Sequence, residues 1–161
     1  MKDKKLELAY QEYNDISELE PADAALLQKA REITRESYAP YSQFHVGAAA
    51  LLANGETVLG TNQENASYPV GTCAERVLLG TAATLHSHIP IQTMAISYRG
   101  TQVKSDHPIS PCGMCRQALL EYETRMKHKI RLILGGMEGE IYVIESAGDL
   151  LPFAFSRQEL G

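Results

Sequence analysis

Three cysteines in two separated clusters constrain this chain more than any other feature. One cluster reads Cys73-Ala74-Glu75-Arg76 and the other reads Pro111-Cys112-Gly113-Met114-Cys115, and together they use every cysteine in the sequence. Three thiolates can hold one zinc ion tetrahedrally and leave its fourth position open, which is typical of a catalytic zinc site and not of a structural one. The sequence therefore predicts a fold that brings both clusters together around one Zn²⁺ per chain.

Glu75 stands two positions after Cys73. The two side chains are too close along the chain to bind the same ion comfortably, but the spacing places a carboxylate beside the metal. Zinc lowers the pKa of a bound water from about 15.7 to near 7, so the open position would supply a nucleophile at neutral pH. A carboxylate there can move protons as a general acid and base. We therefore predict that Glu75 is the catalytic residue.

Two other interpretations of the cysteines remain open at this point. An isolated Cys-x-x-Cys pair is also typical of a redox pair or of half a structural zinc site. A closed structural site would need a fourth ligand from one of the histidines, which are His45, His86, His88, His107 and His128. Because none of them stands at the usual short ligand spacing from a cysteine, the catalytic interpretation is favoured.

Length and charge restrict the organisation and the partners of the protein. At 161 residues the chain is long enough for one domain with its own core and too short for two ordinary ones. We expect an N-terminal extension over residues 1–20 and a single catalytic domain over residues 21–161. The formal net charge is −5 and the sequence contains no lysine- and arginine-rich block, which disfavours a nucleic-acid partner.

Hydropathy gives no indication of a membrane partner. No apolar run approaches the roughly 18 residues of a membrane-spanning helix, and Met1-Lys2-Asp3-Lys4-Lys5 is not followed by the apolar stretch of a signal peptide. Thiols that bind metal also suit a reducing compartment. We therefore expect a cytoplasmic protein.

Hydrophobic patterns predict helices that alternate with strands. Helices are expected at 21–38, 73–86 and 113–127, and strands at 44–53, 57–59, 93–98, 130–134 and 141–144. The alternation of Leu6, Leu8 and Tyr10 predicts a further short strand, and Asn54-Gly55 predicts a type I′ hairpin turn. The pattern indicates an α/β fold, a three-layer α-β-α sandwich around a five-stranded mixed sheet with an extra N-terminal strand.

The motifs together resemble those of a known family. A ligand-x-Glu segment paired with a distant Pro-Cys-x-x-Cys is the signature of zinc-dependent deaminases. Residues 60–68 read Gly-Thr-Asn-Gln-Glu-Asn-Ala-Ser-Tyr, and residues 110–117 read Ser-Pro-Cys-Gly-Met-Cys-Arg-Gln. From about Tyr38 to Leu160 the chain resembles the short, homotetrameric cytidine deaminases. The resemblance implies their fold and the hydrolysis of cytidine and 2′-deoxycytidine to uridine and 2′-deoxyuridine, with release of ammonia, in pyrimidine salvage.

The same resemblance implies roles for further residues. Phe44 would flank the cytosine ring, whereas Asn62 and Glu64 would hold the ribose. Ala74 would also contact the substrate. Arg76 would hydrogen-bond to the thiolates, whose three negative charges exceed the charge of Zn²⁺ by one. Without the resemblance, Phe44 would be interpreted as a core residue and Asn62 and Glu64 as part of a solvated turn. Arg76 would be interpreted as a surface arginine.

The resemblance also implies a homotetramer with active sites shared between subunits. Ala66 and Tyr68 would approach the ribose from across an interface, and Phe155 would stack on the pyrimidine of an adjacent subunit. The alternative is that Phe155 packs only against its own chain, since Ser156-Arg157 departs from the Gly-Pro that often follows this phenylalanine.

Two rival functions remain. A deaminase of nucleic acids or of aminonucleoside antibiotics would use the same chemistry, although the segment from Asn62 to Tyr68 argues against both. A non-catalytic zinc-binding module would share the fold without the reaction.

Overall fold

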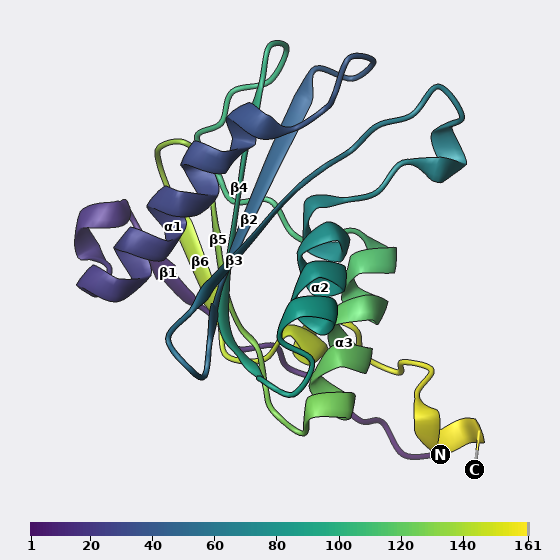
Figure 1. Cartoon of the computed structure of the whole chain (residues 1–161). Coiled ribbons are helices and arrows are strands. Elements are labelled where there is room, and N and C mark those ends of the chain that lie inside the picture. The colour runs from purple at the N-terminus through teal and green to yellow at the C-terminus, as the bar shows by residue number, and fades with distance from the viewer. Residues whose placement is uncertain (161) are drawn as a thin grey trace.

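A mixed β-sheet forms the centre of the molecule (Figure 1). The structure, a computed structural model, describes residues 1–160. The strands are β1 (Gln11–Tyr13), β2 (Phe44–Leu52), β3 (Thr57–Thr61), β4 (Ile91–Gly100), β5 (Arg131–Gly135) and β6 (Ile141–Ile144). Their order is β1-β6-β5-β4-β2-β3, in which β4 and β5 run parallel and all other neighbours are antiparallel.

Helices cover both faces of this sheet. Helix α1 (Pro21–Ile33) lies on one face, and α2 (Ala74–Leu85) and α3 (Gly113–Met126) lie side by side on the other (Figure 1). The three-layer α-β-α architecture predicted from the sequence is therefore confirmed. No helix within residues 1–160 has the length and apolar character needed to cross a bilayer.

The alternation of side chains along the strands builds one core on each face. In β4, Met94 and Ile96 belong to the core beneath α2 and α3, whereas Ala95 belongs to the core beneath α1. Successive strand residues face opposite sides of a sheet, so a strand that is buried on both faces is apolar almost throughout. Helix α1 lies so close to β2 that a side chain at Gly47 would clash with the Ala30 carbonyl oxygen.

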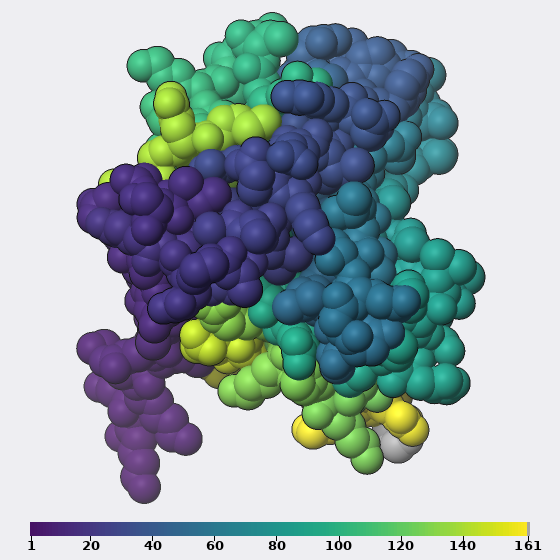
Figure 2. Space-filling view, turned by 60° about the vertical axis from the view of Figure 1, so that its left-hand side comes forward, coloured from purple at the N-terminus to yellow at the C-terminus, as the bar shows by residue number. Residues whose placement is uncertain are grey.

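The extra N-terminal strand is present, but it begins later than predicted. In the antiparallel pairing of β1 with β6, Gln11 lies opposite Val143 and Tyr13 lies opposite Ile141. Tyr10 would lie opposite Ile144, the last residue of β6, and residues 9 and earlier would lie opposite the chain beyond β6, where no strand exists to pair with them. The apolar side chains of residues 6–10 are exposed, and the N-terminal segment extends from the body as an arm (Figure 2).

The turn between β2 and β3 also differs from the prediction. Gly55 has a φ of 86°, but Asn54 is not a positive-φ residue, as a type I′ turn would require. The Gly55 N–H donates to the Leu52 carbonyl, and the Leu52 N–H donates to the Glu56 carbonyl, both at 2.9 Å. This pattern is a type I turn followed by a left-handed glycine. Asn54 instead accepts a hydrogen bond from the Glu56 N–H through its side chain at 3.1 Å.

Helix α1 ends at Ile33, earlier than the predicted residue 38. A 3₁₀ turn over Thr34–Glu36 follows it. The Thr34 hydroxyl donates to the Arg31 carbonyl at 2.7 Å, and the Ser37 hydroxyl donates to the Thr34 carbonyl at 2.9 Å. Because these hydroxyls compete with backbone N–H groups for the carbonyls, they favour the end of the helix here.

A buried carboxylate joins α3 to the chain before β5 and after β6. The Glu123 side chain accepts hydrogen bonds from the backbone N–H groups of Ile130, Ala147 and Gly148 at 2.7–3.1 Å. The Ser146 hydroxyl donates to the same carboxylate at 3.3 Å. No sequence pattern singles out Glu123, because all four donors come from segments that only the fold brings to it.

Glu123→Ala is expected to lower the free energy of unfolding by about 3 kcal/mol or more, since each buried donor left unsatisfied costs about 1–3 kcal/mol. Glu123→Gln keeps one acceptor oxygen and should lose less. Urea denaturation followed by circular dichroism measures both. The matched control is Glu121→Gln, at an exposed position of the same helix. Equal losses for Glu123→Ala and Glu121→Gln would contradict this prediction.

Candidate active site

The two cysteine clusters lie at the beginnings of two neighbouring helices. Cys73 is the N-cap of α2, Cys112 is the N-cap of α3, and Cys115 lies in the first turn of α3. These helices lie side by side on one face of the sheet (Figure 1), so their first turns meet. The positive ends of two helix dipoles favour negative charge on the thiols.

The geometry of the three sulfur atoms fits zinc. The Sγ atoms of Cys73 and Cys112 are 3.8 Å apart, those of Cys112 and Cys115 are 3.5 Å apart, and all three lie within 4.8 Å of one another. Tetrahedral zinc with Zn–S bonds of about 2.3 Å requires sulfur atoms about 3.8 Å apart. Within residues 1–160, no histidine or carboxylate joins this cluster. The cluster therefore offers three ligands for one Zn²⁺ and leaves a fourth position open.

The thiols influence one another's protonation. The pKa of Cys73 is lowered to about 6, chiefly because the Cys115 thiol hydrogen-bonds to it and to a smaller extent because of the positive charge of Arg76. The same hydrogen bond, together with burial, raises the pKa of Cys115. Zinc binds thiolates, so the protons that the three thiols carry compete with the metal. Metal binding must release these protons, so zinc affinity should rise with pH.

Glu75 lies in the first turn of α2, beside this cluster. Its side chain is only 5% exposed. Burial raises the pKa of this carboxyl group, and the negative charge of Cys73 raises it further. A carboxyl group with a raised pKa keeps its proton to a higher pH than an ordinary glutamate does, which favours a role as a general acid as well as a base.

A glycine allows the catalytic helix to lie close to the sheet. An ideal Cβ at Gly60 in β3 would lie 2.5 Å from the Ala74 carbonyl oxygen and 2.7 Å from the Leu78 nitrogen. Any side chain there would push the first turn of α2, and Glu75 with it, away from the sheet. Sequence analysis missed this role, although a glycine within a predicted strand is a signal of close backbone approach.

Two arginines follow the ligand cysteines, and only one is hydrogen-bonded. Within residues 1–160 the Arg76 side chain has no hydrogen-bond partner, so its role beside the thiolates is still a prediction. Arg116 donates from Nε to the Pro111 carbonyl at 2.8 Å and from Nη1 to the Leu150 carbonyl at 3.0 Å. Arg116 thus fixes the loop that carries Cys112, a role that sequence analysis did not assign.

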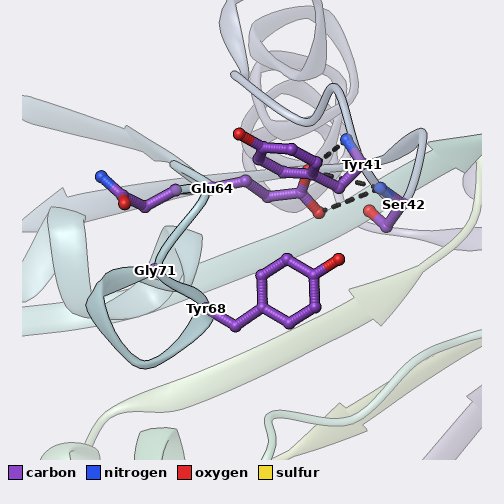
Figure 3. A pocket seen from close by; sticks show the side chains of 6 residues that line it. Tyr41, Ser42, Glu64, Tyr68 and Gly71 are labelled. Atoms are coloured by element: carbon purple, nitrogen blue, oxygen red, sulfur yellow. Dashed lines mark hydrogen bonds between the residues drawn. The ribbon is translucent and has the colours of Figure 1, made fainter.

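A pocket of about 330 Å³ lies next to the predicted ribose-binding segment (Figure 3). Its lining residues are Tyr41, Ser42, Glu64, Asn65, Tyr68 and Gly71. The Glu64 carboxylate accepts hydrogen bonds from the Tyr41 N–H at 2.8 Å and the Ser42 N–H at 3.3 Å. Hydrogen bonding, led by the Ser42 side chain, holds the pKa of Glu64 below its usual range. Neither the cysteines nor Glu75 lines this pocket.

Asn62 and Phe44 belong to the framework beside that pocket. Asn62 accepts from the Val46 N–H at 2.7 Å and donates to the Phe44 carbonyl at 2.8 Å, so its amide ties the end of β3 to β2. The Phe44 ring is half-buried and stacks on Tyr98, with ring centroids 5.1 Å apart and an interplanar angle of 23°. Sequence analysis did not single out Tyr98, because its contact with Phe44 depends on the pairing of β2 with β4.

The residues predicted to act across subunits are on the surface of this chain. Ala66 is exposed, Tyr68 is 75% exposed and Phe155 is 61% exposed. The Gln117 amide of α3 donates to the Phe155 carbonyl at 3.0 Å, which holds the tail beside this helix. Ala74, by contrast, is fully buried in the core beneath α2 and α3.

Comparison with known proteins places these features in a family. A sequence model described as the cytidine and deoxycytidylate deaminase zinc-binding region matches residues 21–128. A cytidine deaminase of Halalkalibacterium halodurans is 35% identical over 135 residues, which cover 84% of this chain and 95% of that protein. One of Mycobacterium tuberculosis is 35% identical over 134 residues, covering 81% and 87%. The crystal structure of cytidine deaminase from Burkholderia pseudomallei superposes with a TM-score of 0.70 at 39% identity, covering 81% of this chain and 97% of that one.

Proposed function

Because the chain belongs to the cytidine and deoxycytidylate deaminase family, we propose that it is a zinc-dependent cytidine deaminase. It hydrolyses cytidine to uridine and releases ammonia. The observation that carries this conclusion is the cluster of Cys73, Cys112 and Cys115 with the buried Glu75 carboxyl group beside it. Zinc held by the three cysteines would activate water at neutral pH.

Glu75 supplies the proton transfers of the reaction. It takes a proton from the attacking water and gives it to ring N3 while the oxygen bonds to C4. It then takes the proton of the new C4 hydroxyl and delivers it to the amino group as the C4–N bond breaks, the C4 carbonyl forms and ammonia leaves. Its raised pKa supports the second step in particular, because burial makes this carboxyl group a better holder of the proton that the leaving group must receive.

We extend the proposal to 2′-deoxycytidine and to pyrimidine salvage in the cytoplasm. Asn62 and Glu64 would hold the ribose, Phe44 would flank the base and Ala74 would contact the substrate. Support comes from the pocket beside Glu64, whose Oε1 accepts one backbone hydrogen bond and so retains acceptor capacity for a hydroxyl group. Arg76 would offset the excess negative charge of three thiolates, as its effect on the pKa of Cys73 supports.

Ammonia release from four substrates, measured side by side, tests the function. We expect turnover of cytidine and 2′-deoxycytidine, and turnover of cytidine monophosphate and a single-stranded oligonucleotide that is lower by at least about a hundredfold. Preferential release from the oligonucleotide would favour a nucleic-acid deaminase. No release from any of the four by zinc-loaded protein would favour a non-catalytic zinc module.

The active site would be completed by neighbouring subunits of a homotetramer. Exclusion of bulk water strengthens the electrostatic interactions on which such a reaction depends. In the single chain Cys112 is exposed to solvent, and the three cysteines do not line the pocket beside Glu64. Residues from other chains are therefore needed to enclose the active site. The exposed Tyr68 and Phe155 are candidates to supply them, together with Ala66.

Mixed tetramers test whether Phe155 acts on a neighbour. Glu75→Gln chains and Phe155→Ala chains are each expected to have low activity. Tetramers that contain both should regain activity, because some sites would combine an intact Glu75 with an intact Phe155 from another chain. Activity of purified mixed tetramers, isolated with two different tags, measures this. No recovery would show that each chain completes its own pocket.

A further inference from the structure

A second pocket lies on the side of the sheet that α1 covers (Figure 1), at the end of this helix. Its volume is about 230 Å³, and it is lined by Gln28, Arg31, Glu32, Arg35, Arg99 and Met137. Figure 2 turns this side of the molecule toward the viewer, with α1 crossing it. Four of the lining residues come from the end of α1 and the turn after it, one comes from β4 and one from the loop before β6. The pocket is thus built from three separate segments.

Arg31 is the buried member of this set, and its charge is not compensated. The residue is 9% exposed, and its Nε donates to the Gly136 carbonyl at 2.8 Å. Its Nη2 is buried and has no hydrogen-bond partner. Burial lowers the pKa of this guanidinium. An unpaired buried charge is costly, so a charged partner for it would be strongly favoured.

The rest of the pocket adds positive charge. Arg35 and Arg99 are both exposed, and within residues 1–160 neither they nor Arg31 form an ion pair. The only acidic lining residue is Glu32, which accepts a hydrogen bond from Gln28 at 3.1 Å. Three arginines and one glutamate give the lining a formal charge of +2 in a chain of net charge −5. Such a local reversal of charge favours an anionic ligand.

A second unsatisfied group lies on the same face of the sheet. The Ser97 hydroxyl is buried and has no hydrogen-bond partner. Ala95, two positions earlier in β4, packs beneath α1, so strand alternation turns Ser97 and Arg99 toward α1 as well. Ser97 does not line the pocket, whereas Arg31 does; because buried polar groups are normally hydrogen-bonded, the unsatisfied Arg31 nitrogen indicates that a polar ligand or ordered water belongs in the pocket.

We propose that this pocket is a binding site for a phosphate group, held by Arg31, Arg35 and Arg99. A dianion matches the +2 lining better than a carboxylate does. Guanidinium groups also match phosphate oxygens with paired hydrogen bonds. The pocket is smaller than the roughly 300–1,000 Å³ of typical sites for drug-sized ligands, so it fits the phosphate group itself, whether free or at the end of a phosphorylated metabolite.

Calorimetric titration of the zinc-loaded protein with inorganic phosphate tests the proposal. The buffer is phosphate-free, and chloride keeps the ionic strength constant because surface electrostatics are screened by salt. We expect saturable binding of one phosphate per chain. Arg35→Gln and Arg99→Gln should each weaken it at least about tenfold, since charged hydrogen bonds are lost. Both positions are exposed, so these variants should fold even if Arg31→Gln does not.

Controls separate the phosphate site from general charge. Arg125→Gln removes one positive charge from the exposed side of α3 and should leave binding unchanged. Titration with a nucleoside monophosphate distinguishes free phosphate from a phosphorylated metabolite as the ligand. An affinity equal to that for inorganic phosphate indicates recognition of the phosphate group alone, and a higher affinity indicates a phosphorylated metabolite. Absence of saturable phosphate binding, equal binding of acetate, or equal weakening by Arg125→Gln would each overturn the proposal. Because no turnover is measured, the result is independent of the deaminase assignment.

Discussion

Glu75→Gln protein is expected to fold and to bind about one zinc per chain, yet to lose roughly 10²–10⁴-fold or more in turnover of cytidine. The amide has nearly the shape of the carboxyl group but cannot exchange a proton with water, ring N3 or the leaving amino group. Since Glu75 is 5% exposed, solvent water has little access to take its place. Steady-state ammonia release, with zinc content by mass spectrometry, measures the effect.

The matched control for this variant is Glu36→Gln, which makes the same change at an exposed position in the turn after α1. It should keep normal turnover. The distribution of the loss between kcat and KM is also informative, because removal of proton transfer should lower kcat while KM changes little. Near-normal turnover of the Glu75→Gln protein would show that another group moves the protons.

Cys115→Ser is expected to abolish both zinc binding and turnover. Cys115 is fully buried, so a serine hydroxyl there would face the metal without supplying a thiolate. Ligands that bind only the folded state stabilise it by about 4 kcal/mol at a thousand times their dissociation constant. The variant should therefore unfold at a lower temperature than the zinc-loaded protein, and a chelator should not lower that temperature further. Zinc content and thermal unfolding, with and without chelator, measure both effects.

Glu75→Gln serves as the comparison for the cysteine variant, because it should lose turnover while keeping the metal and its stabilisation. The two variants thus separate proton transfer from metal binding. A Cys115→Ser protein that retains about one zinc per chain and responds to chelator as the unsubstituted protein does would remove Cys115 from the ligand set. The site would then need a different third ligand.

The cysteine clusters and Glu75 could be identified from the sequence because their chemistry depends on residue type and short spacing. A ligand at a helix start and an acid two residues later stay together whatever the rest of the chain does. The predicted strands and helices followed from hydrophobic periodicity in the same local way. Where two local signals were available, as at Asn54-Gly55, the glycine was placed correctly in a turn but the turn type was wrong.

Features that depend on distant parts of the chain could not be predicted. Residues 6–9 would lie opposite the chain beyond Ile144, the last residue of β6, so most of the segment that was predicted to be a strand has no strand to pair with. The four donors around Glu123 come from Ile130 before β5 and from Ser146, Ala147 and Gly148 after β6, two segments that meet only in the folded chain.

The sequence by itself determined the cluster of three cysteines, the acidic residue beside it that is proposed to transfer protons, and the layered α/β architecture, because each is encoded by residue type and near-neighbour spacing. Only the tertiary structure decided how closely Gly60 lets the catalytic helix approach the sheet and that Phe44 stacks on Tyr98. It also decided that Arg31 is buried without a countercharge beside two other arginines. The physical reason is that burial, desolvation and close packing depend on which distant segments share a surface, and that is settled only when the sheet is assembled.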